Sequence, residues 1–139
     1  MSIEMKKPLP VVQPWSEPFW EGTKNGKLFI QHCKDCDSNI FYPRKICPEC
    51  WSDNLDWIES CGKGTISTFS TAYTLVEPCF EDELPYTLGF IDLDEGIRMM
   101  SRIVDCEPEY ITLGMRVEVT FVEREDFMMP YFKPLKQTL

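Results

Sequence analysis

The chain has little of several features that mark common classes of protein. It contains one histidine, His32, among 139 residues, and it has no Gly-rich loop of the kind that cradles a phosphate. Its apolar runs are only a few residues long, which argues against a transmembrane helix. The first ten residues, MSIEMKKPLP, lack the apolar core of a signal peptide. We therefore expect a cytoplasmic protein with no membrane contact.

Basic residues are scarce in the second half of the chain. Residues 64–139 carry 6 basic and 14 acidic side chains, whereas residues 1–63 carry 8 basic and 9 acidic side chains. Proteins that bind nucleic acids need Lys and Arg to displace counterions from phosphates, and the second half cannot supply them. We therefore expect no nucleic-acid partner. An anionic ligand should prefer the first half, which includes Lys24, Lys27, Lys34, Arg44, Lys45 and Lys63.

Cysteine, in contrast, is abundant, and four of the seven cysteines form two Cys-x-x-Cys pairs. Ten residues separate Cys33/Cys36 from Cys47/Cys50, which is enough for a strand to leave and return. Four thiolates then complete the tetrahedral shell that Zn²⁺ prefers. An odd cysteine count without a secretion signal also favours metal binding over disulfides. We predict a structural zinc site, which cannot activate water because protein fills all four positions.

Iron in a rubredoxin-like site is the main alternative for the same sulfurs, and it would make the protein an electron carrier. In rubredoxin-like turns a glycine often follows the second cysteine of each pair. Here Asp37 and Trp51 occupy these positions. Glycine at these positions helps the turn to donate backbone N–H bonds to the sulfurs. The absence of glycine here therefore disfavours a redox site.

A complete set of catalytic residues is also missing. Cys61, Cys79 and Cys106 lie outside the metal motif, but a nucleophilic thiolate needs a base or a positive neighbour. Cys79 and Cys106 lie among acidic residues, and His32 lies beside a predicted metal ligand. No carboxylate pair stands in an apolar setting that would separate two pKa values. The residues therefore favour a binding or scaffolding role.

The sequence pattern predicts a mainly β protein with a short N-terminal helix. Residues 1–14 are expected to be an extended arm, and the helix should begin after an N-cap at Ser16 and stop near Asn25-Gly26. The pattern predicts the three strands of a zinc ribbon over residues 27–31, 39–42 and 55–59. The metal would supply about 10–16 kcal/mol toward the folding of such a module. We expect an arm and helix over 1–26, a zinc ribbon over 27–61 and an OB-fold domain over 62–139.

The second part of the chain predicts a five-stranded barrel. Its expected strands are 65–76, 86–93, 97–104, 116–122 and Tyr131-Phe132. An acidic loop is expected over 77–83, a tight turn over 94–96 and one helical turn within 105–114. A helical insert before the fourth strand is typical of a small closed barrel of the OB type.

These features together resemble the DUF35 family, whose members join a rubredoxin-like zinc ribbon to an OB-fold. The resemblance covers nearly the whole chain, from Pro18 to Pro134. Besides the two cysteine pairs, it is carried by Phe19-Trp20, Phe41-Tyr42-Pro43-Arg44, Gly62-x-Gly64-Thr65, Leu93-Asp94-Glu95-Gly96, Val104-Asp105-Cys106 and Leu113-Gly114-Met115-Arg116-Val117.

The resemblance implies a role linked to acyl-CoA. Family members are typically small subunits of thiolase-like enzymes, such as benzoylsuccinyl-CoA thiolase, or partners of hydratase-like and aldolase-like enzymes. In such complexes the catalytic residues belong to the larger chain, and the small subunit helps to hold the complex together and can contact CoA. The resemblance therefore implies a hetero-oligomer with a thiolase-like catalytic subunit.

The segment between the cysteine pairs is where we expect contact with CoA or with the partner. Arg44 and Lys45 are expected to approach CoA phosphates, while Phe41 or Tyr42 packs on the ligand or the partner. The alternative is a ribbon packed on its own barrel, with both cations in solvent. The aromatic residues Phe19 and Trp20 either pin the helix to its own domain or dock on the partner. A single-stranded nucleic-acid-binding module remains the alternative function of a zinc ribbon joined to an OB barrel.

Overall fold

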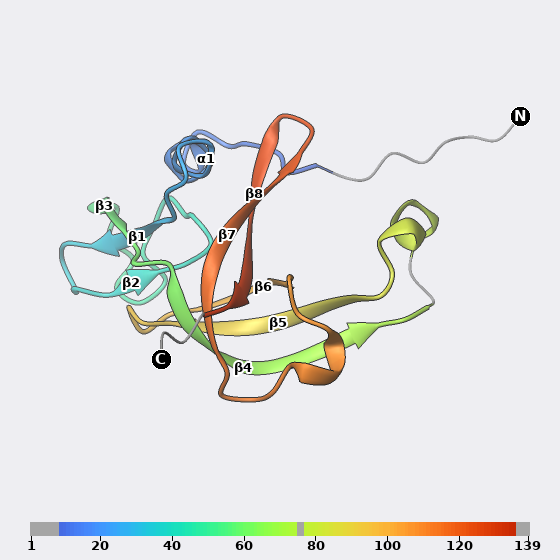
Figure 1. The fold of residues 1–139 in the computed structure, drawn as a ribbon. Coiled ribbons are helices and arrows are strands. Elements are labelled where there is room, and N and C mark those ends of the chain that lie inside the picture. Colours follow the sequence, from blue (N-terminus) through green and yellow to red (C-terminus); the bar gives the residue numbers. More distant parts are fainter. Residues whose placement is uncertain (1–8, 75–76, 136–139) are drawn as a thin grey trace, which may run out of the picture.

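The computed structural model, which describes residues 9–74 and 77–135, confirms a mainly β chain with a short N-terminal helix (Figure 1). Two bodies of strands follow the helix. The first is a three-stranded ribbon, and the second is a closed barrel of five strands. None of the helices in the described part of the chain is long and apolar enough to span a membrane.

Helix α1 (Glu17–Lys24) begins after Ser16 and ends before Asn25, as the sequence predicts, but its first turn lacks the expected side-chain cap. Ser16 occupies the N-cap position, yet its side chain does not cap the helix. Its hydroxyl instead accepts a hydrogen bond from the Gln13 N–H and donates one to the Gln13 carbonyl. At the other end Gly26 adopts a φ of +73°, and the Gly26 and Lys27 N–H groups bond back to helix carbonyls. This left-handed termination is the one that Asn-Gly predicts.

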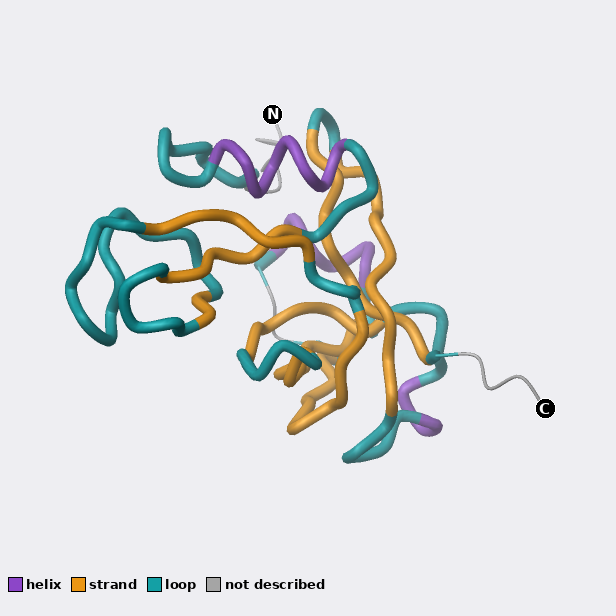
Figure 2. Tube along the Cα trace, turned by 90° about the vertical axis from the view of Figure 1, so that its left-hand side faces the viewer, coloured by secondary structure: helices purple, strands orange, loops and turns teal. Residues whose placement is uncertain are grey.

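The ribbon consists of β1 (Phe29–Cys33), β2 (Asn39–Ile40) and β3 (Leu55–Glu59), paired antiparallel in the order β2-β1-β3. Strand β1 begins two residues later than predicted because the Lys27 N–H still bonds to Gly22 of the helix. Strand β2 ends two residues earlier because Tyr42, at a φ of +61°, turns the chain. The predicted limits of β3 are confirmed. In Figure 2 the ribbon extends away from the barrel, with α1 beside it.

The barrel is closed by β4 (Lys63–Ala72), β5 (Tyr86–Leu93), β6 (Arg98–Ile103), β7 (Arg116–Arg124) and β8 (Phe127–Pro134). Its strand order is β4-β5-β6-β8-β7, and the helical turn η2 (Pro108–Tyr110) precedes its fourth strand. The predicted OB-type barrel is thus confirmed. The expected acidic loop is instead a second 3-10 helix, η1 (Pro78–Glu83).

Four barrel strands differ from their predicted limits. Strand β6 is one residue shorter than predicted at each end, and β7 continues two residues further than predicted. Strand β4 begins two residues earlier than predicted and ends at Ala72, and residues 75–76 of the predicted strand lie outside the described residues. Strand β8 is eight residues long instead of two, and it forms a hairpin with β7 across Glu125-Asp126. Strand β5 has the limits that the sequence predicts.

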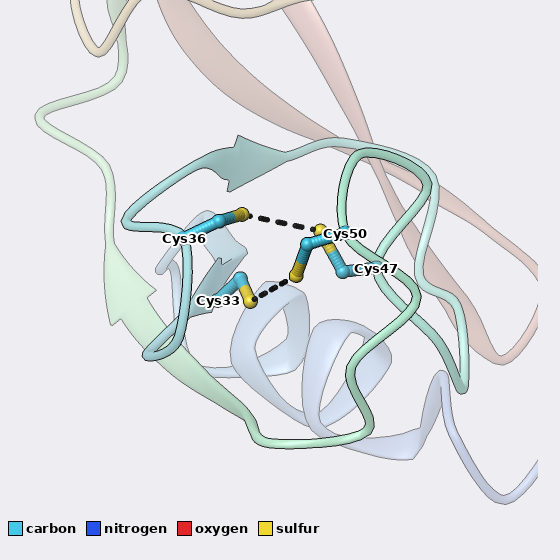
Figure 3. A group of neighbouring side chains, drawn as sticks. All are labelled: Cys33, Cys36, Cys47 and Cys50. Atoms are coloured by element: carbon cyan, nitrogen blue, oxygen red, sulfur yellow. Dashed lines mark hydrogen bonds between the residues drawn. The ribbon is translucent and has the colours of Figure 1, made fainter.

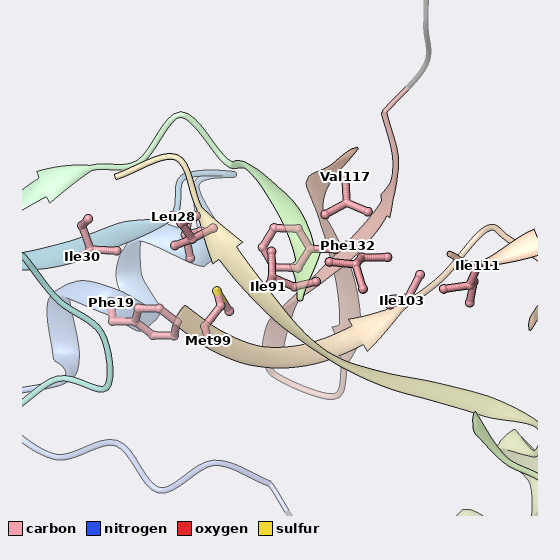
Figure 4. Close-up of a cluster of buried hydrophobic side chains, with 11 residues drawn as sticks. Phe19, Leu28, Ile30, Ile91, Met99, Ile103, Ile111, Val117 and Phe132 are labelled. Atoms are coloured by element: carbon pink, nitrogen blue, oxygen red, sulfur yellow. The ribbon is translucent and has the colours of Figure 1, made fainter. Parts of the chain in front are cut away.

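One apolar cluster runs through both the ribbon and the barrel (Figure 4). Phe19 of α1 joins Leu28 and Ile30 from the ribbon side, and these pack with Met99 and Phe132 of the barrel. Trp20 adds an edge-on contact with Phe127 of β8, at 5.3 Å between ring centres. Full burial of each large apolar side chain contributes about 1.5–3 kcal/mol. The ribbon and the barrel share this core. The predicted boundaries of the arm and helix, the ribbon and the OB-fold domain therefore remain a prediction.

Candidate functional site

The four cysteines of the two Cys-x-x-Cys pairs converge at the far end of the ribbon (Figure 3). Their sulfurs all lie within 4.8 Å of one another, and all four thiols are free. The Cys33–Cys50 and Cys36–Cys47 sulfur pairs are 3.5 Å apart. Sulfurs around a tetrahedral zinc lie about 3.8 Å apart, given a Zn–S distance of about 2.3 Å. The arrangement therefore fits a metal ion held by four sulfurs.

Each cysteine pair sits in the same kind of tight turn. The Asp37 N–H donates to the Cys33 carbonyl, and the Trp51 N–H donates to the Cys47 carbonyl, both at 2.9 Å. Asp37 and Trp51 have φ values of +63° and +67°, a region that glycine adopts more easily. The two turns thus keep the geometry of a metal-binding turn although neither has glycine at this position.

Hydrogen bonds and burial shift the pKa values of two of the four thiols in opposite directions. Hydrogen bonds with the side chain and backbone of Ser38 lower the pKa of Cys36 to about 6. A backbone hydrogen bond from Ser52 lowers the pKa of Cys50, but burial and the neighbouring sulfurs outweigh it and raise this pKa to about 12. Four thiolates cannot share so small a space without a positive charge between them. A divalent metal would stabilise all four, and no coordination position would remain for water or substrate.

The remaining candidate nucleophile and base are poorly placed for catalysis. Burial raises the pKa of the Cys61 and Cys106 thiols, and neighbouring carboxylates add to this effect. Both ring nitrogens of His32 are occupied, Nδ1 by Asn39 at 2.8 Å and Nε2 by Asp37 at 2.9 Å. Outside the two cysteine pairs, Cys61 and Cys106 are therefore not activated as nucleophiles, and the imidazole of His32 is not free to act as a base.

The four predicted aromatic contact residues lie together in one groove. This groove, which we call the ribbon groove, has a volume of about 350 Å³ and runs between α1, the ribbon, β6 and β8. Phe19 and Phe41 pack edge-on at 5.8 Å between ring centres, and Phe41 and Tyr42 do so at 4.9 Å. Its walls are mainly apolar and are formed by Phe19, Trp20, Phe41, Tyr42, Pro43, Leu88, Met99, Met100, Ser101, Arg102, Met129, Pro130 and Tyr131.

The two predicted cations lie outside the ribbon groove. Arg44 is held through its backbone, which exchanges two hydrogen bonds with the Gln31 side-chain amide at 2.9 and 2.7 Å. The Lys45 ammonium lies 4.5 Å from the centre of the Trp15 ring. Both residues are exposed. The basic part of the loop is thus next to the aromatic part but does not line the same groove.

The structure also reveals residues that sequence reasoning missed. A second groove of about 290 Å³ shares Leu88 and Met100 with the ribbon groove and is otherwise formed by β4 and β5, including Phe90. Leu88, Phe90 and Met100 expose 38%, 39% and 50% of their surface. We call these three residues the apolar strip. Its signal in the sequence is YTLGFIDL, where apolar residues occupy both faces of β5, a pattern typical of a strand covered on both sides.

Comparison with known proteins places both bodies of the chain in one family. Residues 20–56 match the ChsH2 rubredoxin-like zinc ribbon domain, and residues 57–122 match the ChsH2 C-terminal OB-fold domain. A DUF35 domain-containing scaffold protein of Methanothermobacter thermautotrophicus is 40% identical over 111 residues, covering 73% of this chain and 82% of that protein. Its counterpart from Methanocaldococcus jannaschii is 36% identical, with 75% and 79% covered.

Longer relatives and a solved structure extend the comparison. A probable enoyl-CoA hydratase alpha subunit of Thermomonospora curvata is 30% identical over 92% of this chain, which spans only 40% of that relative. The solved structure titled "Ltp2-ChsH2(DUF35) aldolase" superposes with a TM-score of 0.81 at 29% identity. The superposition covers 91% of this chain and 98% of that one. With the zinc ribbon and OB-fold both matched, the chain belongs to the DUF35 family.

Proposed function

We propose that this chain is a non-catalytic accessory subunit of a larger acyl-CoA enzyme. It would stabilise a catalytic partner of the thiolase-like class and help to bind the CoA thioester. The names of its relatives support this proposal, since they include scaffold proteins, a hydratase subunit and an aldolase that contains a DUF35 chain. The catalytic residues would lie on the partner.

The single observation that carries the proposal is the apolar strip beside the ribbon groove. Half-exposed Leu88, Phe90 and Met100 form one surface with Tyr42, which is 50% exposed. Contiguous apolar surface of this kind marks sites of association rather than ordinary solvent-facing sheet. The chain pairs this surface with a closed metal centre and thiols of raised pKa, a combination suited to assembly and not to catalysis.

We further propose that the metal is zinc and that its role is structural. Four cysteines from two turns form the donor set typical of structural zinc, and the matched family is described as a zinc ribbon. When bound, zinc would hold the two turns together and so fix the loop between them. Arg44 and Lys45 are the proposed contacts with CoA phosphates, because both are exposed on that loop.

A charge placed in the apolar strip tests the assembly. Met100→Asp should reduce capture of an acyl-CoA enzyme from extracts of the native organism by about tenfold or more, because burying an unpaired carboxylate at an interface is costly. Capture is quantified by mass spectrometry of the retained chains. Leu113→Asp is the matched control, since Leu113 is 68% exposed but lies away from both grooves. Equal capture by the two variants would contradict an interface at the apolar strip.

A further inference from the structure

The tight turn between β5 and β6 contacts four other segments of the chain. This turn, Asp94–Gly96, comes from the barrel, but its hydrogen bonds reach the ribbon, the connection between ribbon and barrel, β4 and β7. The apolar contacts between ribbon and barrel are not directional. Hydrogen bonds are, because they weaken steeply when their angle changes. The turn is therefore suited to fix how the ribbon is oriented on the barrel.

Glu95 makes the central contacts of this turn. Its carboxylate accepts a hydrogen bond from the Ser60 hydroxyl at 2.7 Å and another from the Cys61 N–H at 2.9 Å. Its backbone carbonyl accepts from the Asn39 side-chain amide at 3.0 Å. Ser60 is buried and its hydroxyl also accepts from the Gly62 N–H. One residue of the barrel thus holds both the start of β2 and the end of the ribbon.

Asp94 keeps the turn itself in place. Its carboxylate pairs with two Arg116 nitrogens at 2.7 and 2.8 Å, and its N–H donates to the Lys63 carbonyl. The hydrogen bonds from Arg116 hold the pKa of Asp94 below its ordinary value. Glu95 consequently projects from a turn that is fixed to β4 and β7.

A second contact between ribbon and barrel lies farther along β6. The Tyr42 hydroxyl accepts a hydrogen bond from the Met100 N–H at 3.3 Å. Strand β6 pairs with β5 along its length, but it pairs with β8 only at Ile103. Tyr42 thus occupies an edge of β6 that no strand covers at this point. The ribbon side thus bonds to the β5–β6 hairpin at two points, Asn39 to Glu95 and Tyr42 to Met100, and Tyr42, Met99 and Met100 line the ribbon groove.

We propose that Glu95 is the positioning residue that sets the orientation of the ribbon, and thereby places Tyr42 over β6 and shapes the ribbon groove. The proposal concerns this chain alone. Only its consequence for partner binding rests on the proposed function.

Hydrogen exchange at the Met100 amide tests the proposal, because this N–H reports whether Tyr42 lies on β6. Exchange is followed by NMR on the full, zinc-loaded chain. Tyr42→Phe serves as the positive control, since it removes only the accepting hydroxyl. Glu95→Ala should accelerate Met100 exchange about tenfold, although Glu95 does not touch Met100. The amides of β5 should keep their wild-type rates, and Glu109→Ala, at an exposed acidic position of η2, should change none of them.

Two outcomes would overturn the proposal. The first is a Met100 amide that exchanges at the wild-type rate in Glu95→Ala although it exchanges faster in Tyr42→Phe. The other is equal acceleration of the β5 amides, which would mean that the whole hairpin has loosened. If Glu95→Ala does not fold, Glu95→Gln decides, because it preserves shape but loses one of the two acceptors. It should accelerate Met100 exchange several-fold, and an unchanged rate would reject the role. The readout needs no partner, so it is independent of whether the chain binds an acyl-CoA enzyme.

Discussion

Glu83 pairs with two arginines at once on the outer face of the barrel. It bonds to Arg102 of β6 and to Arg124 of β7, in the latter case at 2.8 Å. The three side chains are only 19%, 14% and 16% exposed. The Arg102 guanidinium also lies 4.2 Å from the centre of the Tyr86 ring. This cluster ties η1 to two strands that are far from it in the sequence.

Removal of the shared carboxylate should therefore destabilise the protein strongly. We expect Glu83→Ala to lower the free energy of unfolding by about 3–5 kcal/mol, because two mostly buried guanidinium groups lose their counter-ion. Urea denaturation measures the change. Asp92→Ala is the matched control, since Asp92 pairs with Arg98 where both side chains are about half exposed. It should cost less than about 1 kcal/mol. Similar losses for the two variants would mean that the Glu83 cluster is no more important than a surface pair.

Arg44 and Lys45 carry the residue-scale prediction for function. In the assembled complex, Arg44→Ala combined with Lys45→Ala should raise the Michaelis constant for the CoA thioester about tenfold, because charge-assisted bonds to phosphate are lost. The turnover number should change little, since these contacts are equal in ground and transition states. Steady-state kinetics of the complex measures both constants. Lys24→Ala with Lys27→Ala, also exposed and in the same half of the chain, is the control. An unchanged Michaelis constant in the first double variant would exclude the contact.

At the scale of elements, the ribbon depends on its metal turns more than on its strands. Strand β2 has two residues, and the ribbon's distal cluster of buried residues consists of Cys33, Ile40 and Cys47. Two of these three residues are proposed metal ligands. The near end of the ribbon, by contrast, shares Leu28 and Ile30 with the barrel core. The proposed metal and the shared core would thus support opposite ends of the same module.

Metal removal should consequently unfold the distal end of the ribbon and leave the barrel folded. We expect the purified protein to contain one zinc per chain by elemental mass spectrometry. After chelation, the amides around the two cysteine turns should lose exchange protection, whereas those of β5 should remain protected. Cys47→Ser should reproduce the effect without a chelator. A visible spectrum of thiolate-bound iron, or unchanged protection after chelation, would contradict a structural zinc.

The sequence predicted those elements whose signals are local. Strand β5 lies between Pro85 and the Asp94–Gly96 turn, so both of its limits are marked. Strand β8 was underestimated because Pro130 and Pro134 lack ladder donors and normally mark strand ends. The turn before it has no glycine, and Glu125 takes its φ of +53° without one. Strand β2 ends earlier than predicted for a similar reason, because Tyr42 adopts a positive φ although it is not glycine.

The candidate site likewise has one part with a local sequence signal and another part without one. The convergence of the four cysteines could be predicted because their spacing places each pair in one turn. The ribbon groove could be predicted only in part, since Trp20, Tyr42, Met100 and Met129 are brought together from four separate segments by the fold. The Glu95 contacts with Ser60 and Asn39 span 35 and 56 residues along the chain, and no local pattern indicates them.

At the scale of the whole molecule, the features combine into a rigid support for one surface. A shared apolar core and the Asp94–Gly96 turn join the ribbon to the barrel, and the metal turns hold the loop from Phe41 to Lys45 between them. The apolar strip lies beside this loop on a chain whose net charge is −9. Such charge keeps the chain soluble while the apolar surface remains available for a partner. We propose that this partner, and not the present chain, performs the chemistry.

Affinity capture of the tagged chain from its native organism, followed by mass spectrometry and a thioester assay of both fractions, tests this claim most directly. We predict that a larger acyl-CoA enzyme of the thiolase-like class is retained and that thioester turnover occurs in the complex but not in the isolated chain. Turnover by the isolated chain, or retention of a nucleic-acid enzyme in place of an acyl-CoA enzyme, would contradict it.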